Sequence, residues 1–561
     1  MTRSALGTMG AVGGLDELLA GLGEVQRTAV TCDDRVMCLL AGAGTGKTRV
    51  LTLRVARRLL DRSVKPGHAL VCTFSRKAAD ELRVRLATLG AGAVEAGTLH
   101  RTALRLLGQH RADHGHAAPI VADRRTLLAA VMEDLGRPPQ APDHRRGGSQ
   151  ATRARPRRAG ELARAEVEIA WAKARLLRPA EYAEAAAAGR RPGAGERTAQ
   201  VYARYEELRR RRGVLDLDDL LWQCADVLES DDQFATAVRW RHRHVFVDEM
   251  QDLNEAQFRL VKLLAGDRPD LFVVGDPNQS IYAWNGADPG LLDRFPDEFP
   301  GTRVLRLEVN HRCSPQVVRA AAVVLGPRAS VPTSTRPDGP APKVVRLTTD
   351  AEEAAWVARQ AWLAHRPGRR WSSIAVLART NAQLVRLEEA LRRERVPCRV
   401  AGADVAPASD LEDSPADDHD DPPTGTDDVP REPAPDNEHD AVVLSTFHRA
   451  KGLQWRTVFV VGLWQGSVPL ASARSRGRDE ERRLLYVALT RAEDELTCSW
   501  ASHPDERAVA AGATPRNPCP WLAALERASA EVPALDGPDV AARQLARIRH
   551  ELARTAAAER S

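Results

Sequence analysis

The sequence has little lysine, few aromatic residues and no long hydrophobic run. Only seven of the 81 basic residues are lysine and aromatic residues make up 4% of the chain, so a lysine or aromatic residue inside a motif is informative. No run of 18 or more apolar residues occurs, which argues against a transmembrane helix. Residues 1–14 lack a basic start followed by a long apolar core, so we expect no signal peptide and no membrane partner.

Cysteine is present but unpatterned. The eight cysteines are scattered and form no CxxC pair, and several lie within apolar runs. This distribution favours small buried core residues in a reducing cytoplasm over a metal cluster.

Charge is distributed unevenly along the chain. The net charge is +5, but residues 404–440 hold fourteen acidic residues against one arginine, which leaves +18 on the remainder. A strongly basic body favours a polyanionic partner. Residues 404–440 have almost no apolar side chains, so we expect them to be a disordered acidic linker.

Short apolar runs alternate with stretches of helical pattern. Such continuous runs are typical of buried parallel strands in α/β domains, and 561 residues suggest two to four domains. Residues 101–215 are mostly helical in pattern, with a loop expected at 141–158, and 536–561 also has helical periodicity. The predicted strands are 36–40, 69–72, 244–247, 271–274, 374–377, 442–444 and 458–461.

A phosphate-binding loop follows the first predicted strand. Residues 41–48 read AGAGTGKT and precede a helix predicted at 49–60. Small residues let backbone N–H groups surround phosphates, Lys47 adds a positive charge, and the Thr48 hydroxyl can bind Mg²⁺. The strand–loop–helix context argues against an accidental glycine-rich turn.

Adjacent carboxylates follow the strand predicted at 244–247. Asp248 is placed to hold the Mg²⁺ shell, and Glu249 to orient and deprotonate the attacking water. The alternative is an acidic helix N-terminus, which the phosphate loop upstream makes less attractive.

Ten motifs follow one another along the chain. In the first half they are LGEVQR (22–27), TFSRKAA (73–79), GTLH (97–100), DLDDLL (216–221), DEMQD (248–252) and VGDPNQSIYAW (274–284). In the second half they are LEVNHR (307–312), RTNAQ (379–383), TFHRAKGLQW (446–455) and ERRLLYVALTRA (481–492). These ordered motifs resemble those of the UvrD/Rep/PcrA family of superfamily 1A DNA helicases, and the chain departs from the family pattern at Arg76, Asn285, His311 and Gln454.

The resemblance implies a role for each matching residue. Catalysis would rest on Lys47, Asp248, Glu249, Gln279, Arg312 and Arg491, with Mg²⁺ held by Thr48 and Asp248. ATP would contact Gln26, Ala41, Gly42, Ala43, Gly44, Thr45, Gly46, Lys47, Thr48, Arg49 and His311. Single-stranded DNA would contact Thr73, Phe74, Thr98, His100, Tyr282, Trp284, Thr446 and His448.

Two of these assignments also have a physical argument. Arg312 and Arg491 lie far from the phosphate loop in sequence, so they could stabilise transition-state charge only if two domains close on one nucleotide; surface salt bridges are the alternative. Tyr282 and Trp284 suit base stacking beside a basic groove, with core packing as the alternative.

We therefore expect an α/β protein with two RecA-like P-loop domains, whose parallel sheets are flanked by helices, and a helical 1B-type insertion. The expected domains are 1–100 with 216–285, the insertion 101–215, 286–403 with 441–500, and a C-terminal helical extension 501–561. The acidic linker 404–440 would replace the family's 2B accessory subdomain, for which it is too short.

By resemblance, ATP hydrolysis would drive 3′→5′ movement on single-stranded DNA, with a 3′-tailed duplex as substrate, in DNA repair or recombination. A nuclease or repair factor is an expected protein partner. One alternative is a UvrD-like ATPase subunit of a defence or regulatory complex that does not unwind DNA. Another is an inactive scaffold, against which the intact catalytic residues argue.

Overall fold

A computed structural model describes residues 15–135, 151–187, 195–326, 329, 331–366, 368–401, 440–473 and 475–530. It divides into two compact units: unit 1 comprises 1–312 with 479–484, and unit 2 comprises 313–478 with 485–561. Most of the acidic segment 404–440, most of the expected loop at 141–158 and the C-terminal stretch 536–561 lie outside the described residues. None of the described helices is long and apolar enough to cross a membrane.

Unit 1 contains a six-stranded sheet whose order is β3-β2-β4-β5-β1-β6, with every pair parallel. The four strands predicted in this part of the chain are all present, and the sheet adds two at its edges. The strands are β1 (Val36–Ala41), β2 (Ala69–Thr73), β3 (Glu95–Thr98), β4 (His244–Val247), β5 (Leu271–Gly275) and β6 (Arg303–Leu307). An edge strand has one neighbour, so β6 carries exposed arginines and lacks the apolar run that marks a central strand.

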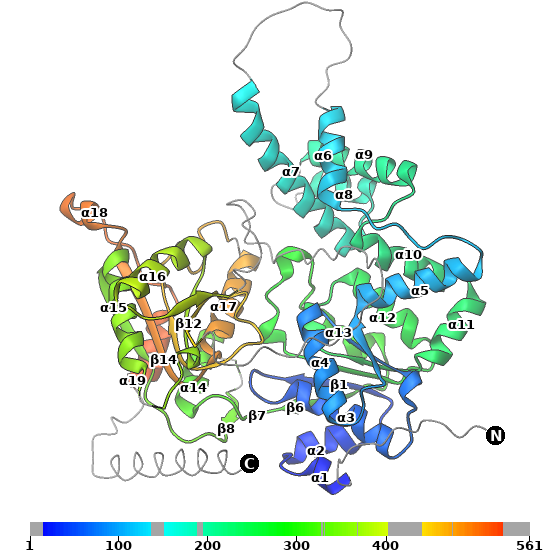
Figure 1. The fold of residues 1–561 in the computed structure, drawn as a ribbon, viewed down its shortest axis with the longest axis horizontal. Coiled ribbons are helices and arrows are strands. Elements are labelled where there is room, and N and C mark those ends of the chain that lie inside the picture. Colours follow the sequence, from blue (N-terminus) through cyan, green and yellow to red (C-terminus); the bar gives the residue numbers. More distant parts are fainter. Residues whose placement is uncertain are drawn as a thin grey trace, which may run out of the picture. The chain divides into compact units, whose positions relative to one another are not determined.

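Helices cover both faces of this sheet (Figure 1). Successive residues of β1 point to opposite faces: Cys38 packs in one core cluster, and Met37 and Leu39 pack in the other. The helices are α1 (Leu15–Leu19), α2 (Glu24–Thr31), α3 (Lys47–Leu60), α4 (Arg76–Thr88), α5 (Leu99–Asp113), α10 (Leu217–Ser230), α11 (Asp232–Arg241), α12 (Glu255–Ala265) and α13 (Leu291–Glu298). Short 3₁₀ turns are η1 (Pro66–His68), η2 (Met250–Asp252), η3 (Pro277–Gln279) and η4 (Ala283–Asn285).

The helical insertion has its own hydrophobic core. It contains α6 (Arg124–Leu135), α7 (Ala151–Ala174), α8 (Pro179–Ala187) and α9 (Glu196–Arg212), which pack through residues such as Leu128, Ile169 and Tyr202. The expected start at residue 101 is corrected: Leu106 and Leu107 of α5 are buried in a core of the sheet, so the insertion begins after α5.

Unit 2 contains a second parallel six-stranded sheet, in the order β11-β12-β10-β13-β14-β9. The three strands predicted here, β10, β12 and β13, occupy its centre. Its strands are β9 (Lys343–Thr349), β10 (Ile374–Ala378), β11 (Cys398–Val400), β12 (Val442–Thr446), β13 (Trp455–Val460) and β14 (Ala492–His503). Unpredicted β14 alternates buried with half-buried positions over its first half, and serines interrupt its buried second half, so it shows no continuous apolar run.

The remaining elements of unit 2 follow the same α/β pattern (Figure 1). They are α14 (Pro315–Leu325), α15 (Asp350–Ala364), α16 (Asn381–Arg393), α18 (Glu506–Ala510), α19 (Leu522–Ala530), β8 (Thr333–Ser334) and η5 (Trp371–Ser373). Strand β7 (Val309–Asn310) belongs to unit 1, and α17 (Ser475–Leu489) contributes residues to both units.

One expected domain boundary is also corrected. We assigned 286–312 to the second domain, but these residues belong to unit 1. The reason is strand pairing: β6 pairs with β1 in the first sheet, so the chain does not leave unit 1 until it has passed Arg312.

Candidate active site

The parallel sheet of unit 1 brings the predicted site residues to one edge. Because all six strands run in the same direction, the segments that follow them meet beyond their carboxyl ends. The phosphate loop follows β1, Asp248 and Glu249 follow β4, and Gln279 follows β5. Motifs more than 200 residues apart in sequence are thereby placed in one site.

The phosphate loop has the backbone conformation that its glycines allow. Gly44 and Gly46 have φ of 72° and 83°, in the left-handed region that favours glycine. Thr45 Oγ1 donates to the Gly42 carbonyl at 2.8 Å, which closes the turn, and helix α3 begins at Lys47. Unpaired N–H groups of a helix start suit an anion.

Four side chains converge beside this loop. Lys47 Nζ lies 3.3 Å from Glu249 Oε2, and Thr48 Oγ1 donates to Asp248 Oδ2 at 3.0 Å. Glu249 is a non-glycine residue with φ of 53°, a conformation that costs free energy and occurs often at functional sites. Because of this left-handed turn, the two adjacent carboxylates contact different partners. Asp248 contacts Thr48, and Glu249 contacts Lys47.

The surroundings of the site disfavour the ionisation of a second carboxyl group. Burial raises the pKa of Asp248 to about 6, with a further contribution from the neighbouring Glu249, while Lys47 and Thr48 lower it. Burial likewise raises the pKa of Asp276. A divalent cation would supply the positive charge that these buried carboxylates lack.

The residues present are suitable for Mg²⁺. The Thr48 hydroxyl and the Asp248 carboxylate are oxygen ligands, already within hydrogen-bond distance of each other. When bound there, the ion would neutralise phosphate charge.

A hydrogen-bonded chain connects the carboxylates to Gln279. Gln251 Nε2 donates to Glu249, and Gln251 Oε1 accepts from the Asp276 backbone N–H at 2.9 Å. Gln279 Nε2 then donates to Asp276 Oδ2 at 2.6 Å. Gln251 and Asp276 were not among our predicted site residues, although they stand within the DEMQD and VGDPNQSIYAW motifs.

Arg312 lies against the phosphate loop within unit 1. A Cβ on Gly44 would be only 2.7 Å from Arg312 Cβ, and the His311 N–H donates to the Gly44 carbonyl at 2.8 Å. Asn310, a further residue that we did not predict, donates through Nδ2 to the Ala43 carbonyl at 2.7 Å. The inference that Arg312 needs domain closure to reach the loop is wrong, since β6 pairs with β1 and ends at the same edge of the sheet.

Gln26 and Arg49 also adjoin the loop. Gln26 is buried, donates through Nε2 to the Thr45 carbonyl at 2.8 Å and accepts from the Gly23 N–H. The pKa of His311 is lowered by partial burial and by the positive charge of Arg49. Gln26 and His311, two of the candidate ATP contacts, thus flank the phosphate loop.

Three aromatic residues form a cluster at the same sheet edge. The rings of Phe74, after β2, and Tyr282, after β5, are stacked with centroids 5.3 Å apart and planes at 17°. Trp284 meets Tyr282 edge to face at 6.4 Å. All three are half-buried, so they are neither fully in the core nor isolated on the surface.

Among the polar residues predicted to contact DNA in unit 1, Thr98 has a local structural role and Thr73 is buried. Thr98 Oγ1 accepts from the Arg101 N–H and caps α5, and Thr73 is 1% exposed. Burial lowers the pKa of His100, which favours the neutral ring. The side chain of Thr73 is not on the surface, because β2 is buried along its whole length.

Unit 2 holds the other three predicted residues. Arg491 is 1% exposed and donates to the carbonyls of Val487 and Leu453 at 2.9 and 3.0 Å. Thr446 is buried at the end of β12. Burial, with Arg379 and Lys451 nearby, lowers the pKa of His448 to about 3.

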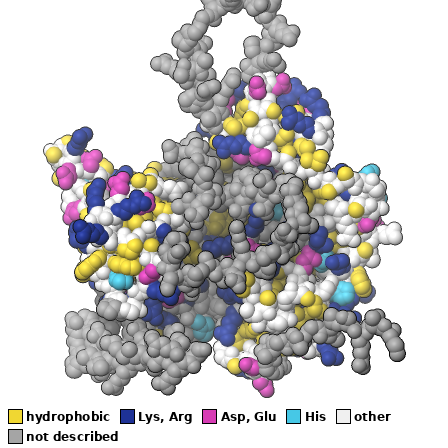
Figure 2. Space-filling view, viewed as in Figure 1, with side chains coloured by type: hydrophobic (Ala, Val, Ile, Leu, Met, Phe, Trp, Pro, Cys, Tyr) yellow, Lys and Arg dark blue, Asp and Glu magenta, His cyan; other side chains and the backbone are white. Residues whose placement is uncertain are grey.

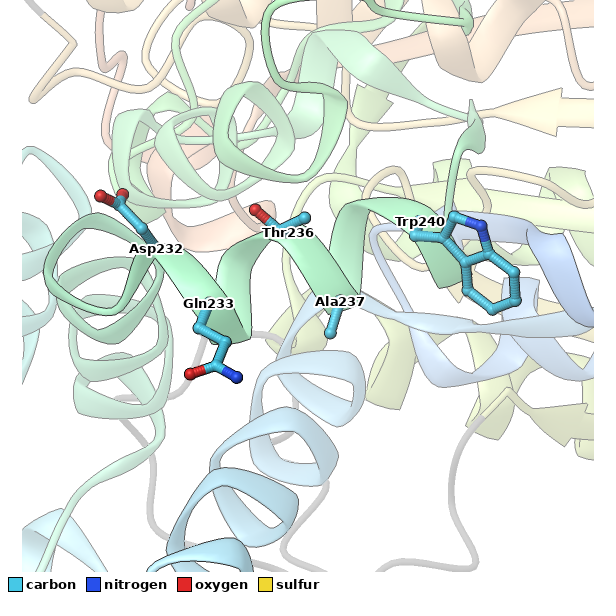
Figure 3. Close-up of a pocket in the computed structure, with 5 residues that line it drawn as sticks. All are labelled: Asp232, Gln233, Thr236, Ala237 and Trp240. Atoms are coloured by element: carbon cyan, nitrogen blue, oxygen red, sulfur yellow. The ribbon is translucent and has the colours of Figure 1, made fainter.

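A shallow surface groove of about 650 Å³ lies elsewhere in unit 1, along α11. Figure 3 shows its lining residues on successive turns of that helix, from Asp232 to Trp240. No predicted site residue lines it, and its walls carry a carboxylate and no cationic side chain. We therefore place the nucleotide chemistry at the phosphate loop and not in this groove.

Comparison with known proteins identifies the family of the chain. The UvrD/REP helicase N-terminal domain matches residues 22–300, and the UvrD-like helicase C-terminal domain matches 305–404 and 431–503. The ATP-dependent DNA helicase UvrD2 of Mycobacterium tuberculosis is 34% identical over 87% of this chain and 79% of its own length. PcrA of Bacillus subtilis is 30% identical over 69% of this chain and 51% of its own length, and UvrD1 of M. tuberculosis is 35% identical over 69% and 50%. The chain belongs to the UvrD/Rep family of helicases.

Proposed function

We propose that the chain is an ATP-dependent DNA helicase that translocates 3′→5′ on single-stranded DNA, acting in repair or recombination. The observation that carries this proposal is the short turn after β5. That turn holds Gln279, joined by hydrogen bonds to the hydrolytic carboxylates, and three residues later Tyr282 of the aromatic cluster. A change at the nucleotide can therefore alter the position of a base-stacking surface.

The geometry of unit 1 supports the proposed hydrolytic roles. Lys47 neutralises phosphate charge, and Glu249, 3.3 Å from it, orients and deprotonates water. Thr48 and Asp248 would hold Mg²⁺. Arg312 supplies a further cation from the segment beside Gly44. Arg491 is proposed as a second arginine on the basis of its motif.

The DNA contact rests on aromatic stacking and positive charge. Phe74, Tyr282 and Trp284 present half-buried rings, which tolerate any base sequence. Lys and Arg side chains are exposed over the helices of the insertion in Figure 2, and α9 ends in the exposed run Arg210–Arg212. Such charge attracts the phosphate backbone without reading sequence.

A second candidate function is an ATPase subunit that does not unwind DNA. The match to the C-terminal family domain leaves only residues 405–430 between its two parts. A 2B-type accessory subdomain does not fit in so short an interval. This observation favours a reduced motor that works with a protein partner such as a nuclease or repair factor.

Two assays separate these functions. ATP turnover is measured with and without single-stranded DNA, and strand separation is measured on duplexes with a 3′ or a 5′ tail. We expect stimulation by single strands and unwinding only of the 3′-tailed duplex. Stimulation without unwinding supports the second function, and a rate insensitive to DNA contradicts both.

A further inference from the structure

Lys173, at the C-terminal end of α7, is the centre of a buried charge cluster. It is one of seven lysines in the chain and is 1% exposed. Its Nζ donates to Asp216 and Asp219 of the α10 start at 2.8 Å each, and Glu206 of α9 lies at the same distance. An ammonium group has three N–H donors, one for each carboxylate.

Arginine residues complete this cluster. Arg124 of α6 pairs with Asp216 at 3.0 Å, and Arg209 of α9 pairs with Asp219 at 2.9 Å. The network therefore joins three helices of the insertion to the first turn of α10, which packs in the core of the ATP-binding sheet. Displacing one of these buried groups would leave the charge of its partner uncompensated, which is costly, so the cluster resists movement of the helices that it joins.

The end of α7 is fixed at two further points. Trp222 of α10 donates through Nε1 to the Lys173 carbonyl at 2.9 Å. Leu176 adopts φ of 60°, where glycine is usual after a helix, and its side chain packs against the sheet core. The backbone strain at Leu176 is thus offset by an apolar contact that glycine could not make.

This fixed helix end contacts the loop that carries the aromatic residues. We define the aromatic loop as residues 280–286, which include η4. Gly286 (φ 93°) approaches α7 so closely that a Cβ there would lie 2.3 Å from Ala174 Cβ. On its other side, the Ala283 N–H donates to Glu480 at 2.8 Å, and Arg483 donates to the Ser280 carbonyl. The aromatic loop is therefore held between α7 and residues 480–483.

We propose that Lys173 is a positioning residue for DNA-stimulated ATP hydrolysis, because it fixes the end of α7 that supports the aromatic loop. The inference rests on the proposed function in one respect, namely that Tyr282 and Trp284 contact single-stranded DNA. Lys173 itself touches neither the nucleotide site nor the aromatic rings in the described structure. It acts through Ala174 and Gly286.

The first test is Ala174→Val, which adds two methyl groups where α7 meets Gly286. Its matched control is Ala165→Val on the same helix, since Ala165 is equally buried but packs in the core of the insertion. We expect Ala174→Val to lower DNA-stimulated turnover and single-strand affinity by between about 5- and 100-fold, with basal turnover retained. Ala165→Val should lower the melting temperature by a similar amount. It should leave the DNA-stimulated turnover and the single-strand affinity unchanged.

Lys173→Arg tests the buried charge cluster itself. Arginine keeps the charge, but its planar fork cannot direct donors to three carboxylates around one nitrogen. We expect the same DNA-specific defect as in Ala174→Val. If this variant does not fold, the Ala174 pair still decides the question.

A double-mutant cycle with Trp284→Ala identifies the route of the effect. If α7 acts through the aromatic loop, Ala174→Val should cost little further affinity once Trp284 is absent. Additive losses, or an equal defect in Ala165→Val, would overturn the inference while leaving the proposed function intact. Unchanged single-strand affinity in Trp284→Ala alone would instead remove the proposed DNA surface, and the inference with it.

Discussion

At the scale of single residues, the site depends on carboxylates held in unfavourable surroundings. Asp248 is 2% exposed and adjacent to another acid, and Glu249 has a left-handed backbone. The left-handed backbone costs free energy by itself, and the buried adjacent carboxylates cost free energy that a cation would offset. Lys47 compensates in part through its contact with Glu249, and a nucleotide–metal complex would compensate further.

Substitution of Glu249 and Lys47 should separate nucleotide binding from hydrolysis. We expect Glu249→Gln to lower ATP turnover by about 10²- to 10⁴-fold with nucleotide binding retained, because only the base is removed. Lys47→Ala should abolish turnover and weaken binding, since a phosphate contact is lost. Turnover rates and fluorescent-nucleotide titration measure these effects. Wild-type turnover in Glu249→Gln would disprove the assignment.

A second residue-scale prediction concerns acid stability. His242 is 1% exposed and its Nε2 lies 3.1 Å from Arg105 Nη2, and burial followed by Arg105 lowers its pKa to about 4. The folded chain therefore leaves His242 neutral between pH 6.5 and 4, whereas the unfolded chain protonates it. The contribution of neutral His242 to the free energy of unfolding is complete above pH 6.5. It is lost as the pH falls, by about 2 kcal/mol at pH 5.

His242→Gln tests this assignment by urea unfolding at pH 7 and pH 5. The variant should lose less free energy of unfolding between the two pH values than the wild type does, because glutamine does not titrate. The exposed His116 provides the control variant His116→Gln, which should follow the wild type. An identical pH dependence in all three proteins would refute the role of His242.

At the scale of elements, function depends on the turns at the carboxyl ends of the strands. The turn after β2 provides Phe74 and the turn after β5 provides Tyr282, and their rings stack only because β4 alone separates these strands in the sheet. Two parallel strands on either side of β4 therefore place residues 208 positions apart in contact. The same arrangement places Arg312 beside the phosphate loop.

The aromatic cluster should govern the response to DNA. We expect Trp284→Ala to weaken single-strand binding by about 1–3 kcal/mol and to reduce stimulation of ATP turnover, because one stacking surface is removed. Trp240→Ala is a matched control, since Trp240 is 62% exposed on α11. Fluorescence anisotropy with a labelled oligonucleotide measures the affinity. Equal stimulation by duplex and single strands would contradict the stacking model.

At the scale of the whole molecule, the charge distribution suggests competition for DNA. Residues 404–440 carry −13 and the remainder of the chain +18. An acidic segment tethered to a basic body can compete with a polyanion for the same surface. The attraction is screened over about 8 Å at physiological salt and should therefore matter mainly at low ionic strength.

Replacing residues 404–440 with a neutral Gly/Ser segment of equal length tests this competition. We expect affinity for single-stranded DNA to rise at low salt and the gain to shrink as salt is added. Anisotropy titrations at several salt concentrations measure it. Unchanged affinity at every salt concentration would leave the segment as a simple connector.

The sequence alone was sufficient to predict the features that depend on short stretches of neighbouring residues. The phosphate loop, the carboxylate pair after β4 and the seven central strands could be predicted because each depends on contiguous residues: small residues for a tight loop, apolar runs for strands buried on both faces. Family membership, now supported by the matched domains, followed from ten such segments in order.

Only the tertiary structure decided which distant residues meet. The edge strand β6 has no apolar run, yet its pairing with β1 moves Arg312 into the unit that holds the phosphate loop. Lys173 has no recognisable motif around it, because its partners come from other helices, far away in sequence. Pairing and burial depend on the whole chain, so no local pattern could reveal that the end of α7 supports the aromatic loop.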